Sequence, residues 1–285
     1  MPSDDGARNQ KSRGKGMKIK LIKTIAFIVF AAVFLVSAIN IGIDLFERNK
    51  TDSYNQSLQN QFVTIVGNQN TESSFSQDSN VGSGEAEVEK PDDTPLPKPQ
   101  DNSPINIDFD ALLELNSDIV GWLYCPNTPI NYPVVKGEDN NEYLRKAIDG
   151  SYLKSGSLFV DYRNGDIMQD LNYIIYGHNT SGESMFGTLT KYKNQDYFDS
   201  HPTFYFMTPE REYVIELVSG NVIHRHSDFY NVNPDFSLVE NLRKSSTFKS
   251  DTEIAKGDKF VTLSTCIWDY KDARYVIIGK ITPIG

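Results

Sequence analysis

The pentapeptide TLSTC, residues 262–266, ends an apolar run that begins at Lys259, and Arg274 lies eight residues beyond Cys266. A second apolar run, residues 275–278, follows the arginine at once. Two such runs predict neighbouring β-strands, with the thiol at the end of one strand and the guanidinium on the next. A thiol in that position can act as a nucleophile. An arginine opposite it can hold the charge that builds up on an attacked carbonyl oxygen.

A site of this kind also needs a histidine, because the thiolate is the reactive form and a nearby imidazole can take the thiol proton. His178, in the sequence Tyr-Gly-His-Asn, is the best candidate. His201 competes with it, as do His224 and His226, which share one face of an expected strand. The last two have the spacing of metal ligands, but no third ligand is obvious, and we expect no metal or other cofactor.

The charge of the chain is unevenly distributed. The formal net charge of the 285 residues is −10, yet the segment up to Lys23 holds seven basic and two acidic residues, a net of +5. The remainder therefore carries −15. An acidic main part argues against nucleic acid as a partner.

Residues 24–43 form an apolar run without a formal charge, which is long enough to cross a bilayer as a helix. Basic residues precede the run, whereas Asp44 and Glu47 follow it. By the positive-inside rule, we expect residues 1–23 to be a cytosolic tail and the rest of the chain to face outwards from the cell membrane. A cleaved signal peptide is the alternative, although its apolar core is usually shorter and ends in a small-x-small site.

The segment 44–104 is predicted to be a linker. Its first part is polar with scattered apolar positions and could continue the membrane helix as a stalk. From residue 68 it is rich in Ser, Asn, Asp, Glu and Pro, and such a composition buries too little surface to offset the entropy of ordering. We expect a disordered tether that holds a folded domain, residues 105–285, away from the membrane.

The folded domain is predicted to be mainly β. Its short apolar runs are rich in Val, Ile, Tyr and Phe and are bounded by turn residues, which is typical of strands in a closed barrel or sandwich. The expected strands are 119–124, 130–135, 157–162, 173–176, 203–207, 213–223, 259–264 and 275–281, and the expected helical segments are 108–115, 140–148, 185–192 and 234–244.

The chain has two cysteines, Cys125 and Cys266. Outside the cytosol they could form a disulfide, which would silence Cys266 as a nucleophile. Cys125 lies in a turn-like Tyr-Cys-Pro-Asn sequence after an apolar run, and we expect it to be an unpaired structural thiol.

The combination of three motifs resembles the sortase family of cysteine transpeptidases, most of all class B. These motifs are TLSTC, the arginine eight residues later and the upstream Tyr-Gly-His-Asn. The stretches GWL (121–123), PINYPVV (129–135) and SGSLFVD (155–161) are also similar to that class. The likeness covers roughly residues 108–281. It implies a mainly β fold: a closed eight-stranded sortase barrel with an N-terminal helix and a helix before the cysteine-bearing strand, on a single-pass membrane anchor.

The resemblance further implies that Cys266 attacks the carbonyl of a threonine in the C-terminal sorting signal of secreted proteins. Arg274 would stabilise the oxyanion, and His178 would transfer protons before a peptidoglycan cross-bridge amine takes over the acyl group. Tyr176, Ser264 and Thr265 would line the peptide groove, although ordinary barrel packing explains Tyr176 and Ser264 nearly as well.

Three alternatives stay open at this point. A pilin-polymerising sortase would use the same chemistry with a lysine side chain as the acceptor. A wall hydrolase or L,D-transpeptidase would also use a cysteine, but usually after a His-Gly type sequence that is absent at Cys266. A membrane-tethered domain could instead bind a peptide without chemistry.

Overall fold

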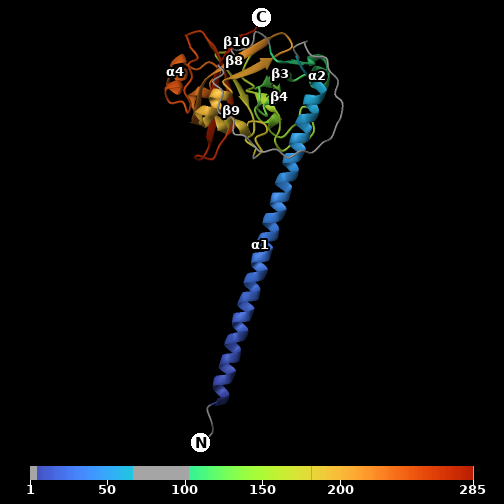
Figure 1. The fold of residues 1–285 in the computed structure, drawn as a ribbon, viewed down its shortest axis with the longest axis vertical. Helices are drawn as coiled ribbons and strands as arrows, with labels where there is room; N and C mark the ends of the chain where they lie inside the picture. The colour runs from blue at the N-terminus through green and yellow to red at the C-terminus, as the bar shows by residue number, and fades with distance from the viewer. Residues whose placement is uncertain (1–4, 67–102, 181, 285) are drawn as a thin grey trace, which may run out of the picture. The chain divides into compact units, whose positions relative to one another are not determined.

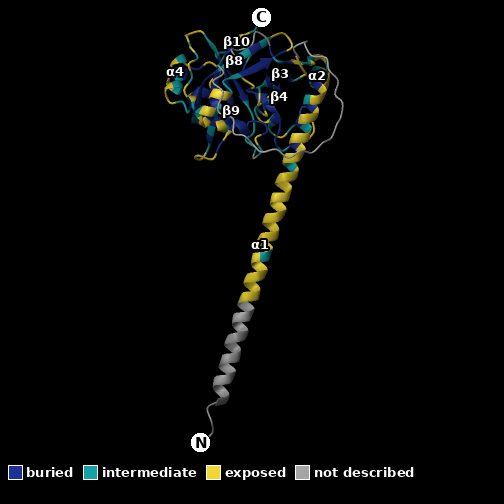
Figure 2. Cartoon of the chain, in the orientation of Figure 1, coloured by how far each residue is buried: buried dark blue, intermediate teal, exposed yellow. Residues whose placement is uncertain are grey.

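The computed structural model describes residues 5–66, 103–180 and 182–284. The chain divides into two units between Lys50 and Thr51. Figure 1 labels the main helices and strands. Helix α1 (Asp5–Phe62) starts in the first unit and ends in the second. One helical stretch of the described chain, within α1, is long and apolar enough to cross a membrane. Its apolar side chains, such as Phe27 and Phe30, are exposed (Figure 2), so α1 is a candidate membrane anchor.

The second unit is built on a closed barrel, in which the strand order is β10-β8-β7-β3-β4-β5-β6-β9. Two neighbouring pairs, β4 with β5 and β6 with β9, are parallel, and the others are antiparallel. The predicted closed barrel is confirmed. The strands are β3 (Ile119–Tyr124), β4 (Asn131–Val135), β5 (Leu158–Val160), β6 (Asn172–Tyr176), β7 (Thr203–Met207), β8 (Glu212–His224), β9 (Lys259–Cys266) and β10 (Ala273–Pro283).

The strand sequences are continuous apolar runs because much of the barrel sheet is buried on both of its faces. Side chains such as Leu263 and Ile277 belong to the interior core. Alternate side chains such as Val276 and Ile278 belong to an outer cluster that also contains Val239 of α4 (Phe236–Lys244). Strands that are buried on both faces lose the simple apolar–polar alternation.

The helical segments agree with expectation in three cases out of four. Helix α2 (Phe109–Leu115) starts at Asp108, whose carboxylate accepts a hydrogen bond from Ala111 N, and η2 (Gly187–Lys193) and α4 also lie where they are expected. The expected helix at 140–148 shrinks to the single turn η1 (Glu142–Leu144), because the chain turns back and pairs Lys146 with Tyr152. Helix α3 (Gln195–Ser200) and the turn η3 (Asp228–Tyr230) were not predicted.

The end of α1, which lies in the segment predicted to be a stalk, belongs to the second compact unit, because this unit begins at Thr51. Leu58 and Phe62, at the end of α1, are 5% and 2% exposed and share a core cluster with Ile105. Strand β1 (Val63–Ile65) then pairs antiparallel with β2 (Ile105–Ile107). Two buried apolar residues in a polar sequence were too weak a signal to predict this docking.

The tether expected from residue 68 lies almost wholly within 67–102, outside the described residues. The two ends of that segment are held side by side, since Ile65 pairs with Ile105 and Val66 N donates to Pro104 O at 3.0 Å.

We therefore predict that replacing residues 67–102 with a short Gly-containing turn preserves the fold and raises the free energy of unfolding by ~2 kcal/mol. The replacement halves the length of the connection between β1 and β2 about three times, and each halving lowers the entropic cost of closing the loop. Urea denaturation of the full chain in detergent, followed by circular dichroism, measures this. Ile105→Asp is the matched control and should destabilise the protein. A shortened loop that unfolds at lower urea than the wild type contradicts the β1–β2 pairing.

Candidate active site

The site is organised by strand β9, which has β6 on one edge and β10 on the other. In the parallel pairing, Tyr176 of β6 stands opposite Ser264 of β9. His178 lies two residues beyond Tyr176, and Cys266 lies two residues beyond Ser264. In the antiparallel pairing, Arg274 stands opposite Cys266. The three predicted residues therefore lie at the same end of the barrel, at or just beyond the ends of three adjacent strands.

Hydrogen bonds continue the contact beyond the end of β6. Gly177 N donates to Ser264 O at 3.1 Å, and Thr265 Oγ1 donates to Gly177 O at 2.8 Å. One residue past the histidine, Asn179 Nδ2 donates to Cys266 O at 2.8 Å. The backbone on both sides of His178 is thus attached to the cysteine-bearing strand.

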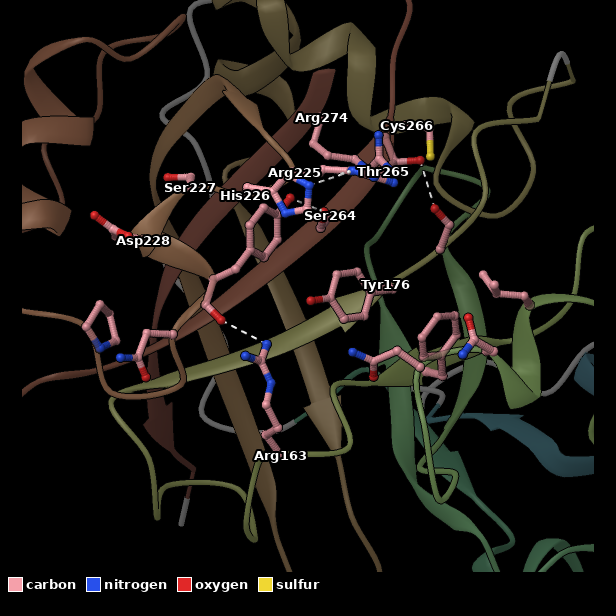
Figure 3. A pocket seen from close by; sticks show the side chains of 18 of the residues that line it. Arg163, Tyr176, Arg225, His226, Ser227, Asp228, Ser264, Thr265, Cys266 and Arg274 are labelled. Carbon is pink, nitrogen blue, oxygen red and sulfur yellow. Dashed lines mark hydrogen bonds between the residues drawn. The ribbon is translucent and has the colours of Figure 1, made fainter. Parts of the chain in front are cut away.

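A groove with a volume of about 1000 Å³ opens at this end of the barrel. Figure 3 shows Cys266 and Arg274 near one end of the groove, with Arg163 farther from them. Turn η3 and the start of α4 contribute to its walls. All six residues predicted from the sequence line it: Tyr176, His178, Ser264, Thr265, Cys266 and Arg274.

The two cysteines lie in different environments. Both are free, with Cys266 exposed and Cys125 fully buried in the barrel core. Burial raises the pKa of the Cys125 thiol to about 12, although a contact of 3.6 Å with the Tyr192 hydroxyl acts in the opposite direction. The disulfide alternative does not hold, and Cys125 is the unpaired structural thiol that its setting predicts.

The environment of His178 favours the neutral imidazole. Partial burial lowers its pKa, and the positive charge of Arg145 lowers it further, while a hydrogen bond with the backbone of Ser155 acts the other way. The pKa therefore lies below the usual value of ~6.5, and at neutral pH the ring is able to accept a proton.

The competing histidines have other positions. His201 follows α3, and its Nδ1 is 3.0 Å from Tyr197 O. His224 ends β8, and His226 lines the groove with Nε2 accepting from Arg225 Nε at 3.1 Å. Of the four, His178 is the one whose chain neighbours, Gly177 and Asn179, are hydrogen-bonded to the strand that carries Cys266.

The groove also contains a hydrogen-bonded network that sequence reasoning missed. Tyr230 of η3 has its hydroxyl 2.7 Å from Ser264 Oγ, and its ring stacks on Tyr176 with the centroids 6.1 Å apart. The Tyr176 hydroxyl donates to the buried Asp161 carboxylate at 2.8 Å, and Arg163 pairs with the same carboxylate. Both Tyr176 and Ser264 therefore use their hydroxyl groups to build the groove. Asp161 closes the SGSLFVD stretch, which was the one available signal.

The barrel strand β9 ends in an exposed thiol, with an arginine in register beside it on β10 and a histidine just beyond the end of β6. This arrangement defines a cysteine-dependent enzyme of the β-barrel type. Residues 123–282 match the family model of the sortase domain. The chain is 30% identical to "Sortase B" of Listeria monocytogenes over 93% of its own length and 99% of that protein. The chain therefore belongs to the sortase family of cysteine transpeptidases, in class B.

Solved structures agree with this assignment. Staphylococcus aureus sortase B is 28% identical with a TM-score of 0.59, and the match covers 62% of this chain and 87% of that one. A Bacillus anthracis protein described as similar to sortase B is 37% identical with a TM-score of 0.55, covering 61% and 82%. Other related structures are a staphylococcal sortase B–substrate complex and a sortase B complexed with triglycine.

We predict that Arg145→Gln raises the pKa of His178, because it removes a positive charge that disfavours the imidazolium. An NMR titration of the ring protons measures the shift. Arg211→Gln, a substitution outside the groove lining, is the matched control and should leave the pKa unchanged. Equal pKa values for His178 in the wild type and Arg145→Gln would contradict the electrostatic description of the site.

Proposed function

We propose that this class B sortase cleaves a C-terminal sorting signal of secreted proteins after a threonine and joins the new carboxyl group to a peptidoglycan amine. The observation that carries the proposal is the exposed Cys266 at the end of a groove, in register with Arg274 and beside the His178 loop. Relatives solved with a substrate and with triglycine, a peptide that has a free amino group, support a peptide donor and an amine acceptor.

In the first half of the reaction, His178 takes the proton of Cys266, and the sulfur attacks the threonine carbonyl. The guanidinium of Arg274 donates hydrogen bonds to the resulting oxyanion. His178 then gives its proton to the leaving amine as the carbon–nitrogen bond breaks, which leaves a thioester on Cys266.

In the second half, the acceptor amine attacks the thioester carbonyl. His178, which is neutral again, takes a proton from the attacking nitrogen, and Arg274 stabilises the second oxyanion. The carbon–sulfur bond breaks and the proton returns to the sulfur, so the enzyme regains its starting state. A pilin-polymerising enzyme would differ only in using a lysine side chain as the acceptor.

The anchor fits the same proposal. The apolar part of α1 would place the N-terminus in the cytosol and the barrel outside, because seven basic residues precede it and two acidic residues follow it. The barrel would then meet secreted substrates and the wall acceptor on the same side of the membrane. Membership of a family of transpeptidases argues against the non-catalytic binding domain.

We predict that the wild-type chain forms a thioester adduct on Cys266 when it is incubated with a panel of sorting-signal peptides, and that Cys266→Ala shows neither adduct nor cleavage. Mass spectrometry of the intact protein and of the peptide products detects both. Cys125→Ala is the matched control and should retain the adduct. A folded wild type with a free thiol that cleaves no peptide would refute the proposed function.

We predict that Arg274→Ala lowers kcat by about 10²–10³-fold with little change in KM, because the oxyanion loses a charged donor. Arg274→Lys should recover part of kcat, since it restores the charge but not the planar fork. Steady-state kinetics on a cleaved peptide gives both constants, with Arg243→Ala on α4 as the control. The assigned role is wrong if kcat of Arg274→Ala stays within about threefold of the wild type.

A further inference from the structure

A buried carboxylate, that of Asp161, lies outside the lining of the groove. The Asp161 side chain is 0% exposed. Its Oδ1 accepts from Arg163 N at 3.1 Å and Arg163 Nε at 2.8 Å. Its Oδ2 accepts from Arg163 Nη2 at 2.6 Å, Tyr176 Oη at 2.8 Å and Asn140 Nδ2 at 3.1 Å. Five donors on one carboxylate compensate for its removal from water.

These donors come from residues that form the groove itself. Asn140, Arg163 and Tyr176 all line it, whereas Asp161 does not. Although burial alone would raise the pKa of Asp161, the hydrogen bonds from Arg163 and Tyr176 hold it below the usual range. The carboxylate is therefore ionised at neutral pH, and its negative charge balances the positive charge of the Arg163 guanidinium.

One nitrogen of the Arg163 guanidinium is not used by the network around Asp161. The Arg163 side chain is 44% exposed and faces the groove (Figure 3). Nε and Nη2 are used by Asp161, and Nη2 also donates to Tyr230 O at 2.9 Å. Within the part of the chain that the structure describes, none of the hydrogen bonds of Arg163 uses Nη1. This guanidinium donor remains available to a ligand in the groove.

The charges around this donor decide what it can bind. A ligand carboxylate would gain Arg163 but would also approach the Asp161 anion, and Asp228 and Asp235 add two more acidic side chains to the groove lining. The other two arginines of the lining, Arg225 and Arg274, lie near Cys266 and away from Arg163 (Figure 3). An uncharged carbonyl oxygen accepts the same hydrogen bond without that repulsion and with a smaller desolvation cost.

We propose that Arg163 is a specificity-determining residue for the peptide substrate: its Nη1 donates to an uncharged carbonyl oxygen, and Asp161 positions the guanidinium and discriminates against a carboxylate there. The proposal rests on the function proposed above, since it assumes that the groove binds the sorting signal. It concerns substrate choice, at a distance from the step carried out at Cys266.

The test uses the full chain in detergent and a peptide that the wild type cleaves. It also uses variants of this peptide in which one amide side chain at a time is replaced by its isosteric acid, Asn by Asp or Gln by Glu. At one position the wild type should prefer the amide over the acid in kcat/KM. Asp161→Asn should lower this preference by about tenfold, because the positive charge of Arg163 is then uncompensated. The double variant Asp161→Asn/Arg163→Gln should restore it.

Asp118→Asn is the matched control, because Asp118 also accepts a tyrosine hydroxyl bond, from Tyr143 at 2.6 Å, but does not line the groove. It should leave the preference unchanged. Arg163→Gln alone should raise KM for the amide peptide several-fold and widen the amide-to-acid ratio, since Asp161 is then unneutralised. A general structural defect would not move the ratio in opposite directions in the two single variants.

If the amide-to-acid ratio is the same in the wild type and Asp161→Asn, the inference is wrong and the proposed function stands. If Asp161→Asn does not fold, as judged by circular dichroism, Arg163→Gln decides: a raised KM with a wider ratio supports the inference, and an unchanged KM and ratio refute it. A wild type that cleaves no peptide refutes both proposals.

Discussion

The pairing of β9 on both of its edges is the constraint on which the rest of the structure depends. Its parallel partner β6 brings in the His178 loop, and its antiparallel partner β10 brings in Arg274. A shift of one residue in either register would turn the facing side chains to the opposite side of the sheet and separate the three groups. The core opposes such a shift, because a slip would take Val261 and Leu263 out of the barrel interior and separate the buried hydroxyls of Thr262 and Ser264 from their hydrogen-bond partners.

The groove shows how segments distant in sequence are joined into a binding surface. A buried ion pair contributes little net stability when its partners could be replaced by apolar residues, but breaking it leaves an uncompensated charge. Asp161 fits this description, since its five donors come from three separate segments. Its main effect is therefore on the arrangement and the charge of the groove.

The sequence allowed the prediction of features that depend on local pattern. Apolar runs between turn residues located the barrel strands to within a few residues, and two adjacent runs predicted Arg274 beside Cys266. The parallel contact of β6 with β9 joins residues about ninety positions apart and leaves no local pattern. The docking of Leu58 and Phe62 and the network around Asp161 were missed for the same reason. His178 was selected over three other histidines by the combination of motifs that resembles the sortases.

The central claim is that strand register places His178, and no other histidine, beside Cys266. The most direct test is the rate of Cys266 alkylation by iodoacetamide as a function of pH, measured by mass spectrometry in the wild type, His178→Gln and His226→Gln. The buried Cys125 thiol does not compete, because its pKa is about 12. The account predicts that His178→Gln changes the pH profile and that His226→Gln leaves it unchanged. A profile that is insensitive to His178, or one that follows His226, would contradict it.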